Sequence, residues 1–183
     1  MSAASIVSSF PPQIGSGCRV LILGTMPGVR SLMAGQFYAH PQNLFWLFMG
    51  TLYGAAPEQS YAARIARLHD AGIGLWDVLA HCERNGSLDS NIRADSAVPN
   101  DIQALLESHP SIRAIALNGK EASKLFTRRI APRIEAVRLA RTTILALPST
   151  SPANASIPRA LKLDRWSELL RWSSASTEMV GMG

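Results

Sequence analysis

A glycine-rich turn that directly follows a short apolar run is the feature that most constrains how this chain can fold. The run is Val-Leu-Ile-Leu at residues 20–23, and the turn is Gly-Thr-Met-Pro-Gly at residues 24–28. Residues 38–46, Tyr-Ala-His-Pro-Gln-Asn-Leu-Phe-Trp, then mix aromatic and polar side chains. This order predicts a buried strand whose carboxyl end leads into a ligand-binding loop. Packing alone can also explain the turn, but the polar residues in the cluster favour a binding site.

The length of 183 residues suits one domain with one sizeable core. We expect a flexible N-terminal arm at residues 1–16, a single domain at 17–172 and a flexible tail at 173–183. Because there is neither a secretory signal nor an apolar run of roughly 18 residues, we expect a cytoplasmic protein without membrane contact. Cys18 and Cys82 are then expected to be reduced thiols. Two cysteines cannot build a four-cysteine zinc or iron–sulfur site, and we expect no metal and no organic cofactor.

The positive charge is concentrated in the C-terminal third of the chain. Residues 1–112 contain 6 Lys or Arg and 8 Asp or Glu, whereas residues 113–171 contain 12 and 4. A basic segment of this kind is typical of proteins that bind a polyanion such as nucleic acid, although a solvated basic surface explains it as well.

Four short apolar segments predict the strands of one parallel sheet: residues 20–23, 73–79, 112–117 and 143–147. Segments with helical spacing of apolar residues lie between and after them, at residues 43–52, 61–71, 100–108, 119–130 and 157–173. Asn100 is the expected cap of the third helix. Strands that alternate with helices predict an α/β protein, a three-layer α/β/α sandwich with a central four-stranded parallel sheet. The ligand site is expected at the carboxyl ends of these strands.

The loops that leave the four strands carry aromatic, amide, carboxylate and hydroxyl groups. No P-loop, complete Gly-x-Gly-x-x-Gly motif, metal-ligand spacing or nucleophile–base pair stands out among them. Five segments are informative together: Leu-Gly-Thr-Met-Pro-Gly at 23–28, residues 38–46, Gly-Ile-Gly-Leu-Trp-Asp-Val at 72–78, Gly-Ser-Leu-Asp-Ser-Asn-Ile at 86–92, and Leu-Pro-Ser-Thr-Ser-Pro-Ala-Asn-Ala at 147–155.

In this order the segments resemble the uracil-DNA glycosylase superfamily, and within it the hypoxanthine-DNA (deoxyinosine) glycosylase branch, its sixth family. The resemblance covers about residues 18–172. It implies a DNA repair glycosylase that hydrolyses the N-glycosidic bond of a deaminated base, hypoxanthine first. The base would be flipped out of double-stranded DNA into a pocket. We expect a monofunctional, monomeric enzyme associated with the nucleoid that starts base excision repair.

The resemblance also implies roles for individual residues. Asn43 is the expected catalytic residue. Tyr38 would stack on the base, and Asp77 would read its edge. Gly24 and Met26 from the first motif and Asn118 from the third loop would also bind the base. The last segment would contact DNA through Leu147, Pro148, Ser149, Thr150, Ser151, Pro152, Ala153 and Asn154.

Several of these residues have a structural alternative. Asn43 can cap the helix that begins at Leu44, and Tyr38 can belong to the core. Asp77 can cap a helix or pair with Arg84 or Arg93. His40 can bond to phosphate, water or backbone.

The DNA-contacting segments have such alternatives too. Residues 147–154 can be a Pro-rich turn, and Asn118 a turn residue. Three basic residues follow at near-helical spacing: Arg159, Lys162 and Arg165. They can track a DNA backbone, or they can form a solvated helix face.

Two departures from the superfamily leave other functions open. Met26 stands where the first motif usually has Asp or Asn, and Leu147 stands where the second motif usually has His or Asn. Neither side chain can polarise water. The alternatives are a mismatch-type uracil or thymine-DNA glycosylase, a DNA-damage binding protein without catalysis, and a small-molecule α/β enzyme with a basic surface.

Overall fold

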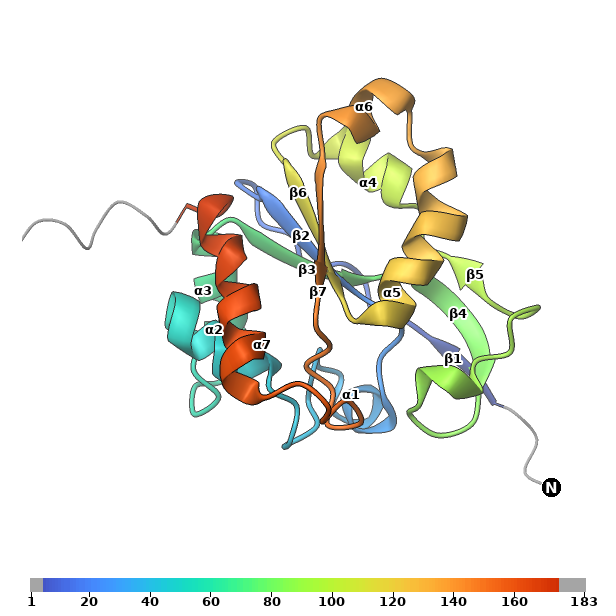
Figure 1. The fold of residues 1–183 in the computed structure, drawn as a ribbon, viewed down its shortest axis with the longest axis horizontal. Coiled ribbons are helices and arrows are strands. Elements are labelled where there is room, and N and C mark those ends of the chain that lie inside the picture. Colours follow the sequence, from blue (N-terminus) through green and yellow to red (C-terminus); the bar gives the residue numbers. More distant parts are fainter. Residues whose placement is uncertain (1–4, 175–183) are drawn as a thin grey trace, which may run out of the picture.

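A computed structural model of the protein, which describes residues 5–174, contains a central parallel sheet of four strands (Figure 1). The strand order is β3 (Ile73–Asp77), β2 (Val20–Gly24), β6 (Ala114–Asn118) and β7 (Thr143–Leu147). Gly24 lies opposite Asp77 in the register, and Asn118 lies opposite Leu147. The carboxyl ends of all four strands therefore meet at one edge of the sheet.

Helices cover both faces of this sheet (Figure 1). One face carries α2 (Phe45–Tyr53), α3 (Tyr61–Asp70) and α7 (Arg159–Trp166), and the other carries α4 (Ile102–Ser108) and α5 (Lys120–Leu125). Successive side chains of a strand point to opposite faces of the sheet, so each strand contributes to two cores. In β2, Val20 and Ile22 pack against the helices of the first face, whereas Leu21 and Leu23 pack against those of the second. This arrangement confirms the predicted three-layer α/β/α sandwich. It buries both faces of the sheet, as its continuous apolar strands require.

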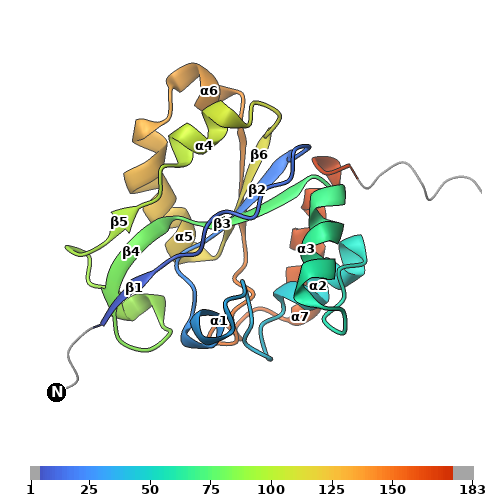
Figure 2. The ribbon, with the colours of Figure 1, turned by 180° about the vertical axis from the view of Figure 1, so that it is seen from behind.

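A second, antiparallel sheet was not predicted from the sequence. It consists of β1 (Ser5–Ser8), β4 (Leu79–Arg84) and β5 (Val98–Pro99), in the order β1-β4-β5. The segment at 73–79, expected as one strand, is divided at Val78, whose backbone N–H donates to the Gly24 carbonyl at 2.8 Å. Beyond this point the chain leaves the parallel sheet and pairs with β1 (Figure 2).

Backbone contacts are present near both expected ends of the domain. The described part of the expected arm, residues 5–16, contains β1 and an isolated backbone pairing of Gln13 with Leu75. At the other end, the Ser174 N–H donates to the Ala71 carbonyl at 2.9 Å. Residues 175–183 of the expected tail lie outside the described residues.

Local capping also differs from the prediction in one place. Asp101, not Asn100, caps α4, because its Oδ1 accepts from the Ala104 N–H at 3.0 Å. The Asn100 side chain instead donates to the carbonyls of Asp77 and Leu79, at 2.9 and 3.0 Å. Asn100 thus supports the point where the chain passes from one sheet to the other.

The remaining elements are short. They are α1 (Val29–Ala34), η1 (Asp89–Asn91), the π-helical η2 (Phe126–Ile130) that continues α5, η3 (Ala131–Arg133), α6 (Ala136–Ala140) and η4 (Ser167–Arg171). Cys18 and Cys82 are buried and free, as predicted. A helix long and apolar enough to cross a bilayer is not found between residues 5 and 174.

Candidate active site

A cavity of about 600 Å³ opens at the carboxyl ends of the parallel strands. All four strand-end loops contribute to its wall, and so does a segment beyond β4, as the parallel topology predicts. The wall is formed by residues 24–28, 30, 31, 37, 38, 40, 43, 77, 87–90, 118–121 and 149–154.

Asp77, the last residue of β3, provides the only carboxylate among the expected base-binding residues. Its side chain is 3% exposed, and its Oδ2 accepts a hydrogen bond from the Ser9 hydroxyl at 2.7 Å. Its Oδ1 lies beside Gly24, where a Cβ atom would approach to 2.7 Å. Burial raises the pKa of Asp77 to about 7, and the Ser9 hydrogen bond opposes this shift because it favours the carboxylate. A side chain at position 24 would therefore collide with the Asp77 carboxyl group, and glycine avoids this collision.

Tyr38 lies beside Asp77 in a backbone conformation that only glycine adopts easily. Its φ is 56°, which is the sole positive φ of a non-glycine residue between residues 5 and 174. Its ring stacks on Phe45, with centroids 3.9 Å apart and planes 21° apart. Burial raises the pKa of the Tyr38 phenol above its ordinary range, so the hydroxyl stays protonated. Tyr38 therefore packs against the aromatic core and also lies in the cavity wall.

Asn43 supports the start of a helix and also lies in the cavity wall. Its Oδ1 accepts a hydrogen bond from the Phe45 N–H at 3.0 Å, which supports the first turn of α2, and the residue lines the cavity. This backbone donor fixes the amide orientation and leaves one lone pair on Oδ1. His40 lines the cavity as well, and its Nδ1 accepts from the Gln42 N–H at 3.2 Å.

Asn118 holds two loops together. Its Oδ1 accepts from the Thr150 N–H, and its Nδ2 donates to the Thr150 hydroxyl, each at 3.0 Å. Thr150 is fully buried, and its carbonyl accepts from the Leu44 N–H at 3.0 Å. This chain of bonds joins the loop after β7 to the turn after β6 and to the start of α2.

The structure brings only part of the expected DNA-contacting segment to the cavity. Ser149, Thr150, Ser151, Pro152, Ala153 and Asn154 line it. Leu147 and Pro148 do not, because Leu147 ends β7 within the core and the Pro148 carbonyl accepts from the Trp166 indole N–H at 2.9 Å. Lys162, expected on a DNA-facing or solvated surface, is 2% exposed and donates to the carbonyls of Ser149 and Asn154.

Arg84, expected only as a possible partner of Asp77, supports the backbone beside the cavity. Its side chain is fully buried and donates to the Gly86 carbonyl at 2.9 Å, to the Met26 carbonyl at 3.4 Å and to the Pro27 carbonyl. It also lies 3.9 Å from the Asp89 carboxylate. Met26 is itself buried, at 6% exposure, and lines the cavity. Arg84 therefore holds the first motif against the segment at 86–90.

Two exposed cations at the cavity wall were also missed. Arg30 on α1 and Lys120 at the start of α5 both line the cavity. The sequence signal was weak, since each is a single basic residue within a turn or a short helix. Among the described residues, no cluster of three His, Cys, Asp or Glu side chains could hold a metal ion.

Comparison with known proteins places this chain in a defined class. The family model of the uracil DNA glycosylase superfamily matches residues 11–170. The chain therefore belongs to the uracil DNA glycosylase superfamily, which confirms the resemblance seen in its motifs.

Two relatives share one name. Two curated proteins named hypoxanthine DNA glycosylase are similar to this chain. The one from Methanosarcina barkeri is 34% identical over 63% of this chain and 72% of its own length. The one from Methanosarcina acetivorans is 35% identical over 65% of this chain and 75% of its own length.

A solved structure agrees with the fold. The solution NMR structure of a Methanosarcina acetivorans protein, described as a proposed uracil DNA glycosylase, superposes with a TM-score of 0.74 at 30% identity. The match covers 91% of this chain and 98% of the other.

Proposed function

We propose that this protein is a monofunctional DNA glycosylase that removes a deaminated base, hypoxanthine first, from double-stranded DNA. The observation that carries the proposal is a buried carboxylate, Asp77, which lies in the cavity wall with its Oδ1 beside Gly24. The similarity to two proteins named hypoxanthine DNA glycosylase supports the choice of base. The enzyme would act as a monomer on DNA in the cytoplasm, at the nucleoid, without a metal or organic cofactor.

The carboxylate suits the edge of a deaminated base. Hypoxanthine carries an N1–H donor, and uracil carries an equivalent N3–H, so Oδ1 of Asp77 can accept from either. Adenine has a lone pair at N1 instead, which the carboxylate repels. Because unpaired polar groups in a buried site are costly, such a pocket rejects the wrong edge strongly.

Asn43 supports hydrolysis of the glycosidic bond in this proposal. The Phe45 N–H holds its amide in one orientation, so the remaining lone pair of Oδ1 can orient a water molecule toward the sugar. The amide dipole also stabilises the positive charge that develops on the sugar as the base departs. An amide is no strong base, and the expected rate is therefore modest.

The outer wall of the cavity fits a nucleic-acid strand. Ser149 and Ser151 offer hydroxyls, and Arg30 and Lys120 offer positive charge for the phosphates beside the flipped nucleotide. Pro152, Ala153 and Asn154 would fill the place that the base leaves in the stack. Lys120 is exposed, whereas lysines that form Schiff bases are commonly desolvated, so we expect no covalent trapping by borohydride.

The proposal is tested with duplexes that contain a single inosine, uracil or xanthosine, followed by alkaline cleavage of abasic sites. We expect release from the inosine duplex first. Asn43→Ala should lower it about 100-fold or more, which is the scale of losing one polar contact to the transition state. The matched control is Gln42→Ala, because Gln42 is a neighbouring, exposed amide outside the cavity wall, and it should retain activity.

Other outcomes select other functions. Dominant release of uracil or thymine would identify a mismatch-type glycosylase. Tight binding of the inosine duplex without release would identify a damage-binding protein. If the protein neither binds the inosine duplex nor releases a base from it, the proposal is overturned.

A further inference from the structure

The N-terminal segment reaches the base-binding end of the cavity through one side chain. The Ser9 hydroxyl donates to Oδ2 of Asp77 at 2.7 Å, across 68 residues of sequence. The carbonyl of Phe10 lies farther from this hydroxyl, at 3.3 Å, and is a weaker acceptor than a carboxylate. We infer that Ser9 is a positioning residue, which holds the Asp77 carboxyl group so that Oδ1 faces the base. This inference rests on the proposed function.

The hydrogen bond from Ser9 gives the two carboxylate oxygens of Asp77 different roles. Oδ2 is occupied by Ser9, while Oδ1 lies where a Cβ atom on Gly24 would stand 2.7 Å away. A carboxyl group without a partner on Oδ2 could turn about its last bond and present either oxygen. With Ser9 in place one oxygen remains for the base, which makes the acceptor position definite before the base arrives.

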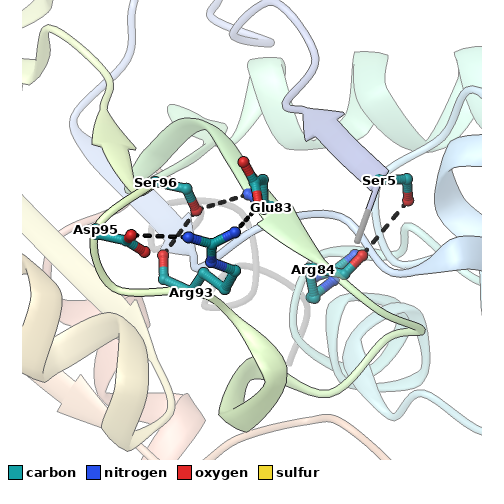
Figure 3. Close-up of polar contacts among 6 residues, drawn as sticks. All are labelled: Ser5, Glu83, Arg84, Arg93, Asp95 and Ser96. Atoms are coloured by element: carbon teal, nitrogen blue, oxygen red, sulfur yellow. Dashed lines mark hydrogen bonds and ion pairs between the residues drawn. The ribbon is translucent and has the colours of Figure 1, made fainter. Parts of the chain in front are cut away.

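The backbone around Ser9 is held on both sides. Before it, β1 pairs with β4 from Ser5 opposite Arg84 to Ser8 opposite His81. Figure 3 shows the Ser5 hydroxyl directed at the Arg84 carbonyl, and beside it the contacts of Arg93 with Glu83 and Asp95 near β4.

After it, the Phe10 carbonyl accepts from the Trp76 indole N–H at 2.9 Å. The Ser9 N–H itself donates to the Ala80 carbonyl at 2.8 Å. Ser9 thus directly follows a paired strand and is itself bonded to β4. It lies outside the 11–170 segment that matches the family model.

The charges around Asp77 give the inference a measurable consequence. Burial and the carboxylate of Asp89 raise the pKa of Asp77, whereas the Ser9 hydrogen bond and the Arg84 guanidinium lower it. The phenols of Tyr38 and Tyr61 also lie near Asp77, and burial keeps both protonated. Loss of the Ser9 hydroxyl removes a donor to the carboxylate form, so the pKa of Asp77 should rise further.

The experiment compares Ser9→Ala with three variants in single-turnover release of hypoxanthine between about pH 5.5 and 9. In Ser9→Ala we expect about 10-fold slower release at neutral pH and an acid limb shifted upward by about one pH unit. Ser9→Thr keeps the hydroxyl and should restore the wild-type midpoint. Ser9→Cys keeps a side chain of similar size, but its thiol is only a weak donor. This variant replaces Ser9→Ala in the test if the alanine variant does not fold. Ser8→Ala, at the neighbouring exposed position, should match the wild type.

A second readout does not depend on catalysis. Carbon-13 NMR can follow the titration of the Asp77 carboxyl group, assigned with Asp77→Asn, in the wild type and in the Ser9 variants. An equal Asp77 midpoint in Ser9→Ala and wild type, with equal release rates, would overturn the inference. If the wild type releases no base, the proposed function fails, and the NMR midpoints still decide whether Ser9 controls Asp77.

Discussion

At the scale of single residues, two side chains in the cavity are held in states that a chain ordinarily avoids. Asp77 is a buried carboxyl group whose pKa is raised to about 7, and Tyr38 has a φ of 56°. Both conditions cost stability, and proteins retain them mainly where function needs them. The two side chains meet beside Gly24, where both would touch a Cβ atom, and this supports the proposed base-binding role of this end of the cavity.

The raised pKa of Asp77 has a consequence for stability. Below about pH 4 the carboxyl group is protonated in both folded and unfolded chains, and its burial carries no ionisation penalty. Between about pH 4 and 7 only the unfolded chain ionises, so stability is lost as the pH rises, and above about pH 7 the loss is complete.

We therefore expect Asp77→Asn, which cannot ionise, to gain stability over the wild type across this range. The gain should reach about 4 kcal/mol at the upper end, from 1.36 kcal/mol for each unit of pKa difference. Urea unfolding of both proteins at several pH values measures it. A stability difference that stays constant with pH would contradict the prediction.

At the scale of elements, the loops of the cavity are held by side chains from elements next to them. Asn118 at the end of β6 and Arg84 at the end of β4 each bond to the backbone of a neighbouring loop. Lys162 on α7 does the same beneath the loop at 149–154. Loops held in this way lose little entropy when a ligand binds, which favours a preformed site.

Lys162 provides the test of this view. Lys162→Met keeps most of the buried volume but removes the donor to the Ser149 and Asn154 carbonyls. We expect a loss of about 2 kcal/mol in the free energy of unfolding, the scale of hydrogen bonds to a charged group, and weaker binding of an inosine duplex. Arg159→Met, at an exposed position of the same helix, should change stability by less than about 0.5 kcal/mol. Equal effects of the two substitutions would contradict a holding role for Lys162.

At the scale of the whole molecule, the positive charge is spread differently from what the sequence indicated. Part of it serves the fold, because Arg129 and Arg138 donate to backbone carbonyls of neighbouring segments. The region around α6, which Arg133 and Arg141 flank, lies at the end of the molecule opposite α1 (Figure 1). The basic composition of the C-terminal third is therefore not a measure of the charge at the cavity.

This distribution predicts which cations contribute to DNA affinity. Arg30→Ala and Lys120→Ala should each weaken binding of an inosine duplex and reduce the slope of log affinity against log salt by about 1. Arg133→Ala and Arg141→Ala should leave both quantities unchanged. Fluorescence anisotropy over a range of salt concentrations measures affinity and slope together. A larger effect from the Arg133 and Arg141 variants would place the DNA on the other end of the molecule.

The sequence was most informative where the signal is local. The apolar runs at residues 20–23, 73–79, 112–117 and 143–147 predicted the parallel sheet, and a parallel sheet brings its carboxyl ends together. For this reason Tyr38, Asn43, Asp77 and most of residues 147–154 could be expected near one cavity. The small antiparallel sheet could not, because β1 and β5 have only four and two residues and no clear alternation.

The sequence by itself thus determined the fold class, the position of the cavity and the family to which the chain belongs. Only the tertiary structure decided which side chains hold the site: Ser9 on Asp77, Arg84 on the first motif, Asn118 on Thr150 and Lys162 on the loop at 149–154. The physical reason is the separation along the chain. Periodicity reports which face of an element is buried, whereas a hydrogen bond between residues 9 and 77 depends on how two sheets pack, and no local pattern encodes that.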